Sequence, residues 1–116
     1  MVLRKFVERL TKPIEDLDHE ELTEFCSSLG LTPMGEIEPR SQVRVVGEVR
    51  SVRIVPRAGA DALEATIHDG SGKLTAVFLG RRKIPGISPG RRLVLEGVVA
   101  REHGYNNVYN PLYTLL

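Results

Sequence analysis

The chain has 116 residues, of which 41% are hydrophobic and 27% charged, and its formal net charge is +1. This length suits one globular domain that needs no metal or disulfide to fold. The single cysteine excludes an internal disulfide and favours a reducing, cytoplasmic location. No apolar run approaches the ~20 residues that cross a bilayer, so we expect no membrane association. Taken alone, the near-zero net charge argues against a nucleic-acid partner.

The charge is distributed unevenly along the chain. Residues 1–38 contain four basic and nine acidic residues, a net charge of −5, whereas residues 39–116 contain twelve and six, a net charge of +6. Such an asymmetry favours an anionic partner for the basic part. A solvated surface that happens to be basic explains the charge alone equally well.

Two amphipathic helices are predicted in the acidic segment, at about residues 2–11 and 19–29, because apolar residues recur there at helical spacing. Asp18 is expected to be the N-cap of the second helix, with Glu21 completing a capping box. Gly30 suits the left-handed end of that helix. Because two short helices have little core of their own, we expect the segment 1–38 to pack on the rest of the chain.

From about residue 41 the pattern becomes that of β-strands. Five strands are predicted, at about residues 43–54, 63–68, 74–79, 93–99 and 108–115. Gly47 is expected to mark a bulge or a sharp bend in the first strand, and Gly97 a bend in the fourth. Residues 69–72 predict a tight turn. Pro111 restricts the fifth strand to an edge or an end.

The predicted fold is mainly β, a five-stranded barrel over residues 39–116 preceded by the two helices. Short strands joined by tight turns are typical of a small barrel or sandwich. Three details favour the five-stranded OB barrel: a long first strand kinked at a glycine, a tight Asp-Gly turn between strands two and three, and a longer connection before strand four.

Three stretches carry a resemblance to a known family. Residues 45–49, 67–78 and 89–99 resemble, in order and spacing, an OB-fold nucleic-acid-binding domain. They are most similar to the wedge OB domain of RecG-type branch-migrating helicases. Small stand-alone OB-fold proteins of actinobacteria are also similar, and they share the acidic helices and the segment 79–86. The resemblance implies nucleic-acid binding, but this chain has no helicase motor and keeps only Phe78 of the wedge's aromatic residues.

Basic and aromatic side chains are the candidate binding residues, because Lys and Arg neutralise phosphates and aromatic rings stack on bases. The set comprises Arg44, Arg50, Arg53, Phe78, Arg81, Arg82, Lys83, Arg91, Arg92, Tyr105 and Tyr109. Phe78 lies in a strand that is apolar throughout, which favours the core over stacking. Tyr105 and Tyr109 lie in a polar hairpin, which favours exposure. A solvated loop is the alternative for Arg81–Lys83.

No catalytic residues, metal site or cofactor are predicted. The three histidines are isolated, and no pair has the spacing of metal ligands. Cys26 lies on a helical apolar stripe, which favours a small buried hydrophobic residue over a nucleophile. The Gly-rich Lys-Ser/Thr pattern of a phosphate-binding loop is absent from the sequence.

The sequence therefore predicts a non-enzymatic OB-fold protein that binds single-stranded DNA or RNA, DNA in preference, with little sequence specificity. The alternative is a protein–protein interaction module that uses the OB surface or the acidic helices. In a third hypothesis the acidic helices cover the basic face and block it. The oligomeric state stays open.

Overall fold

The computed structural model describes residues 14–116. One α-helix lies in this part of the chain, α2 (Ile14–Ser28), followed by the short 3₁₀ helix η1 (Met34–Glu36). The strands follow in the order β1 (Gln42–Arg57), β2 (Ala60–His68), β3 (Lys73–Leu79), β4 (Arg92–Glu102), β5 (Tyr105–Tyr109) and β6 (Leu112–Leu115). The helix predicted at about residues 2–11 lies outside the described residues.

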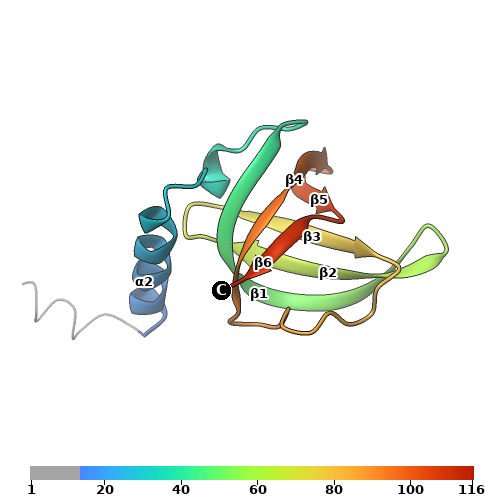
Figure 1. Ribbon diagram of the computed structural model, residues 1–116, viewed down its shortest axis with the longest axis horizontal. Coiled ribbons are helices and arrows are strands. Elements are labelled where there is room, and N and C mark those ends of the chain that lie inside the picture. The colour runs from blue at the N-terminus through green and yellow to red at the C-terminus, as the bar shows by residue number, and fades with distance from the viewer. Residues whose placement is uncertain (1–13) are drawn as a thin grey trace, which may run out of the picture.

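The strands form one sheet that closes into a barrel (Figure 1). Their order is β1-β2-β3-β5-β4-β6, and β1 also pairs with β4, which closes the sheet through its first five strands. The pairs are antiparallel except for β3 and β5, which run parallel. The predicted five-stranded closed barrel is confirmed, and β6 adds a short strand to β4.

The main core fills the barrel with one apolar side chain from each alternate strand position. It includes Val45, Val49, Leu63, Ile67, Leu74, Ala76, Leu93, Leu95 and Val108. The connection between β3 and β4 contains no helix, and its Ile84 and Ile87 are buried in the same core. Met34 and Ile37, from the predicted acidic segment, also belong to it.

Helix α2 stands beside the barrel and packs on the outer face of β1 and β4 (Figure 1). Leu22 and Cys26 form a second apolar cluster with Val46 of β1 and Val94 of β4. The guanidinium of Arg92 lies 4.4 Å from the centroid of the Phe25 ring.

No helix in residues 14–116 is long and apolar enough to cross a membrane.

Three local predictions are corrected by the structure. Asp18 lies inside α2 rather than at its N-cap, and a residue with helical backbone cannot cap a helix that already extends to Ile14. The bulge in β1 lies between Val49 and Ser51 rather than at Gly47. The strand predicted at 108–115 is two strands, β5 and β6, separated at Asn110 and Pro111.

The predicted end of α2 is confirmed. Gly30 has a φ of +67°, and its N–H donates to the carbonyl of Ser27 at 3.2 Å. This is the left-handed closure for which glycine is favoured, because it has no Cβ to clash.

Candidate nucleic-acid interface

A polar groove crosses the outer face of the barrel. It has a volume of about 740 Å³ and lies over β1, β2 and β3, with the β4–β5 hairpin forming one wall. Four polar residues are direct partners on successive strands of the sheet. Ser51 of β1 pairs with Thr66 of β2, which pairs with Thr75 of β3, which pairs with Asn107 of β5. Directly paired residues point to the same face of a sheet. These four polar side chains therefore form a continuous line across the groove.

Basic and aromatic side chains surround that line. Arg53 and Arg57 of β1 and Lys73 of β3 line the groove. His103 and Tyr105 line it from the β4–β5 hairpin, and Tyr105 is 62% exposed. The groove thus combines the cationic and aromatic groups that bind phosphates and bases.

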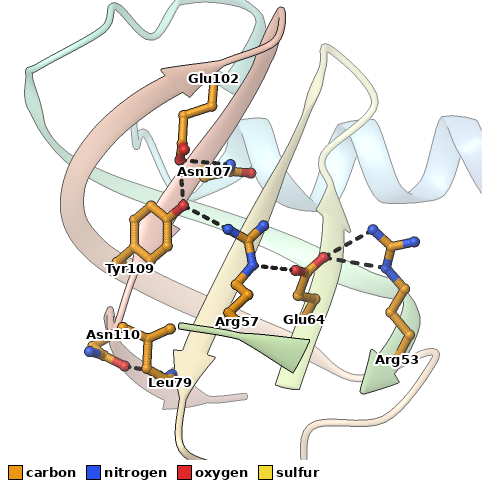
Figure 2. Close-up of polar contacts among 8 residues, drawn as sticks. All are labelled: Arg53, Arg57, Glu64, Leu79, Glu102, Asn107, Tyr109 and Asn110. Atoms are coloured by element: carbon orange, nitrogen blue, oxygen red, sulfur yellow. Dashed lines mark hydrogen bonds and ion pairs between the residues drawn. The ribbon is translucent and has the colours of Figure 1, made fainter. Parts of the chain in front are cut away.

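A buried carboxylate holds the two arginines in place. Glu64 of β2 is only 4% exposed although it points to the outer face of the sheet. Its Oε2 accepts a hydrogen bond from Nε of Arg57 at 2.7 Å, and its Oε1 accepts two from Arg53, at 3.1 Å and 3.3 Å. Both guanidinium groups are therefore fixed against the sheet, and their remaining N–H groups are available to a ligand (Figure 2).

The network continues across β3 to the β4–β5 hairpin (Figure 2). Nη1 of Arg57 donates to the Tyr109 hydroxyl at 2.9 Å, and that hydroxyl donates to Oε1 of Glu102. The same oxygen accepts a hydrogen bond from Nδ2 of Asn107 at 3.2 Å. The chain of contacts joins β1, β2, β5 and β4, so it ties the two walls of the groove together.

The contacts explain the protonation of these groups. Burial raises the pKa of Glu64, but the hydrogen bonds from Arg57 and Arg53 outweigh it and hold that pKa below its ordinary value. The hydrogen bonds from Tyr109 and Asn107 lower the pKa of Glu102. The same contact with Glu102 raises the pKa of Tyr109. At neutral pH both carboxylates are charged and the Tyr109 hydroxyl is protonated.

The charges of the groove nearly cancel. Three cations, Arg53, Arg57 and Lys73, stand beside two carboxylates, Glu64 and Glu102. Among the described residues, Lys73 makes no ion pair. Of the three cations in the groove, Lys73 therefore binds a phosphate at the lowest cost in free energy, because no existing ion pair has to be broken.

The predicted binding residues are divided among several surfaces. Arg53 and Tyr105 line the groove, and Tyr109 holds its wall. Arg81, Arg82 and Lys83 are exposed after β3, and Arg82 contacts Asp61 of β2 at 3.3 Å. Since β2 begins at Ala60, this basic loop lies at the end of the sheet where β1 reaches Arg57.

Four other predicted cations lie away from the groove. Arg44 contacts Glu96 of β4 at 3.5 Å, and Arg92 contacts Glu48 at 3.1 Å beneath α2. Arg50 and Arg91 are exposed at the bulge of β1, where the N–H of Val49 donates to the carbonyl of Arg91.

Phe78 is buried in the barrel. Its ring meets that of Tyr113 edge to face, with 5.7 Å between their centroids. This contact and its 5% exposure leave no face of the ring for a base. We therefore leave Phe78 out of the proposed interface.

Several groove residues were absent from the sequence prediction, among them Arg57, Glu64, Lys73 and Glu102. Arg57 had a usable signal, because it continues the two-residue period of Ser51 and Arg53 on the outer face. The acidic residues had no such signal, since a carboxylate is not expected in a site for an anionic ligand.

The described part of the chain offers no group of three or more His, Cys, Asp or Glu side chains that could hold a metal. Cys26 is buried between α2 and the barrel, and desolvation, followed by the charge of Asp69, raises its pKa to about 11. Its thiol is therefore protonated at neutral pH and a poor nucleophile.

Comparison with known proteins agrees with the topology. No family model matches the chain, and no curated protein matches it. Among solved structures, it is similar to RecG bound to a three-way DNA junction, with a TM-score of 0.62 and 17% identity over 72% of this chain. The barrel is an OB fold. The OB-fold resemblance seen in the sequence is thus confirmed, with RecG among the structural neighbours.

Two further structures share the OB fold. One is a chain of a replication protein A heterotrimer bound to single-stranded DNA, with a TM-score of 0.50 and 14% identity over 76% of this chain and 73% of that one. The other, described as structural mimicry for functional antagonism, has a TM-score of 0.57 and 11% identity. This chain spans 12% of the RecG chain, so it corresponds to a small part of that protein.

Proposed function

We propose that this OB-fold protein binds single-stranded nucleic acid in the groove, DNA in preference to RNA and with low overall sequence specificity. The observation that carries the proposal is the groove itself, where a line of polar side chains across four strands is flanked by Arg53, Arg57 and Lys73 and by the exposed Tyr105. Such a surface suits a backbone that runs along the cations while bases stack on an aromatic ring.

The structural neighbours support the choice of nucleic acid. The RecG structure holds a three-way DNA junction and the replication protein A structure holds single-stranded DNA. The proposal for this chain is binding without catalysis. The near balance of charge in the groove favours a modest affinity, with a salt dependence set by the few phosphates that the groove neutralises.

Fluorescence anisotropy with labelled oligonucleotides, titrated with salt, tests the proposal. We expect Lys73→Gln to weaken binding to every sequence and to reduce the slope of log K against log salt by about 0.7, one phosphate contact on a single strand. Arg40→Gln removes the same charge from an exposed site before β1 and should leave the slope unchanged. Absence of binding at low salt, or equal slopes for the two variants, would overturn the proposal. A matched RNA oligonucleotide tests the preference for DNA.

The basic loop decides how far the bound strand extends. If the strand continues from Arg57 past the end of the groove, it reaches Arg81–Lys83. The triple substitution Arg81→Ala, Arg82→Ala and Lys83→Ala should then weaken the binding of long oligonucleotides more than that of short ones. Equal effects on both lengths would confine the site to the groove.

One observation favours a protein partner as a second function. Within the described sheet, β6 pairs with β4 alone, and its first residue Leu112 and the following Leu116 are 72% and 51% exposed. A free strand edge with apolar side chains can pair with a strand of another protein. Capture of one stoichiometric protein that survives nuclease treatment, and that Leu112→Asp abolishes, would support this alternative.

A further inference from the structure

We propose that Glu102 and Tyr105 form a subsite for a guanine base at the hairpin end of the groove. The inference rests on the proposed function and deepens it, because it adds one base-selective position to an interface that otherwise binds the backbone. Three features carry it: the placement of the two side chains, the unused oxygen of Glu102, and the retention of a negative charge in a groove for an anion.

The β4–β5 hairpin places the two side chains together. Glu102 and Tyr105 are direct partners in the antiparallel pair, and both line the groove. Residues so paired have Cβ atoms roughly 5 Å apart on one face of the sheet. His103 and Gly104 between them have φ values of +52° and +82°, which make the tight turn that brings them side by side. A base stacked on the exposed Tyr105 ring would present its edge toward Glu102.

The hydrogen bonds of Glu102 leave one oxygen for a ligand. Oε1 accepts from both the Tyr109 hydroxyl and the Asn107 amide, which fixes the carboxylate in one orientation (Figure 2). Oε2 has no hydrogen bond or ion pair within residues 14–116. The subsite therefore offers one ionised acceptor oxygen.

Guanine matches this arrangement better than the other bases do. Its N1–H and N2–H are adjacent donors, and both can approach a carboxylate. In cytosine and adenine the amino group stands beside a ring nitrogen that repels a carboxylate. In thymine and uracil the N3–H lies between two carbonyl oxygens that do the same. Unpaired bases in a single strand expose these edges.

The charge of Glu102 argues against a purely structural role. A glutamine at this position could accept the same hydrogen bonds from Tyr109 and Asn107 through its carbonyl oxygen. The charge strengthens these two hydrogen bonds, but it also repels phosphates unless the ligand supplies donors to the second oxygen. A base with two adjacent donors turns this repulsion into a charge-assisted hydrogen bond.

A series of oligonucleotides of about ten nucleotides, within the site size of one OB fold, tests the subsite. Four are oligothymidylate with one central base replaced by guanine, hypoxanthine, adenine or cytosine, and the fifth is unsubstituted oligothymidylate. Hypoxanthine lacks the 2-amino group of guanine, so it isolates the second donor. We expect the guanine oligonucleotide to bind roughly tenfold more tightly than the others, the range for one well-placed pair of hydrogen bonds.

Glu102→Gln should abolish this preference while leaving thymidylate binding equal or slightly tighter. Glu96→Gln on the same strand, whose side chain contacts Arg44 outside the groove, should preserve it. A wild-type protein that binds all five oligonucleotides equally, or a Glu102→Gln variant that still prefers guanine, would overturn the subsite but leave the proposed function standing. Absence of binding to any of them at low salt would instead overturn the proposed function. Tyr105→Ala should weaken the binding of all five oligonucleotides. An unchanged affinity would count against stacking of a base on the Tyr105 ring.

Discussion

At the scale of single residues, Glu64 organises the groove. A carboxylate that is 4% exposed on an outward strand face is unusual, because an acidic side chain is rarely buried without partners. Arg53 and Arg57 lie across it and remove it from solvent. The ion pairs in turn reduce the freedom of both guanidinium groups, which lowers the entropy that a ligand loses when it binds them.

We expect Glu64→Gln to destabilise the fold by about 1–2 kcal/mol at neutral pH, because the amide loses the negative charge and its nitrogen cannot accept from either arginine. The pKa of Glu64 is lowered in the folded state, so its contribution is full above the ordinary pKa and is lost as the pH falls through the lowered value. Urea denaturation at neutral pH and at about pH 3 measures this. The difference between wild type and variant should shrink in acid, and a constant difference would contradict the ion-pair explanation.

The sequence located part of this site. Arg53 and Tyr105 were found because basic and aromatic residues were sought in strands and hairpins, and the two-residue period of β1 places Arg57 on the same face as Arg53. Glu64 and Glu102 were missed because an acidic side chain is not expected in a site for an anionic ligand, although their hydrogen-bond partners are near in sequence. The Tyr109 hydroxyl is 52 residues from Arg57, and no local pattern records that contact.

At the scale of secondary-structure elements, glycines allow the strands to approach their neighbours. Gly47 of β1 and Gly97 of β4 have no positive φ, so their role is space rather than backbone conformation. A Cβ on Gly47 would lie 2.8 Å from the backbone oxygen of His68 and 2.7 Å from side chains of Ile67 and Met34. The predicted bulge at Gly47 is thus replaced by close packing of β1 beneath η1.

We expect Gly47→Ala to destabilise the protein by about 2–3 kcal/mol, because the backbone of β2 has to move to admit the methyl group. Gly104→Ala is the matched control: it has open space around it and a φ of +82°, so it should cost only about 1 kcal/mol of backbone strain. Thermal and urea unfolding of both variants measures the order. Equal losses of unfolding free energy in the two variants would show that close packing at Gly47 adds nothing to the effect of the substitution.

The break between β5 and β6 shows why one predicted strand became two. Asn110 has a φ of +47°, and its N–H donates to the carbonyl of Val77 while its Oδ1 accepts from the N–H of Leu79. Pro111 follows and has no N–H for a ladder. Both hydrogen bonds hold Asn110 against the end of β3, so β5 stops there. The chain then turns and pairs with β4 as β6.

At the scale of the whole molecule, the charge asymmetry is arranged in space. The described acidic helix α2 packs over Val46 and Val94 on the β1–β4 face, and none of its residues lines the groove. In the described residues, α2 therefore leaves the groove open. Its acidic side chains act on a bound nucleic acid through solvent, where a Debye length of about 8 Å at physiological salt limits them.

We expect Glu21→Gln with Glu24→Gln, both exposed on α2, to strengthen oligonucleotide binding slightly at low salt and not at physiological salt. Glu36→Gln with Glu38→Gln gives the same change in net charge outside α2 and should behave alike. Anisotropy titrations at two salt concentrations make the comparison. A gain for the helix variant that persists at physiological salt, and that the control lacks, would support the hypothesis that the acidic segment covers the basic face.

Much of this protein was determined by its sequence alone. The switch from helical to alternating periodicity, the turn at Asp69 and the helix end at Gly30 are local signals, and local sterics and hydrogen bonds decide them. Together with the spacing of the strands they predicted the closed barrel. The tertiary structure decided which charges act together, because cross-strand pairing brings Arg57, Glu64, Tyr109 and Glu102 into one network. It also separated Arg44 and Arg92 from the groove, since the two faces of a barrel strand point in opposite directions and α2 covers one of them.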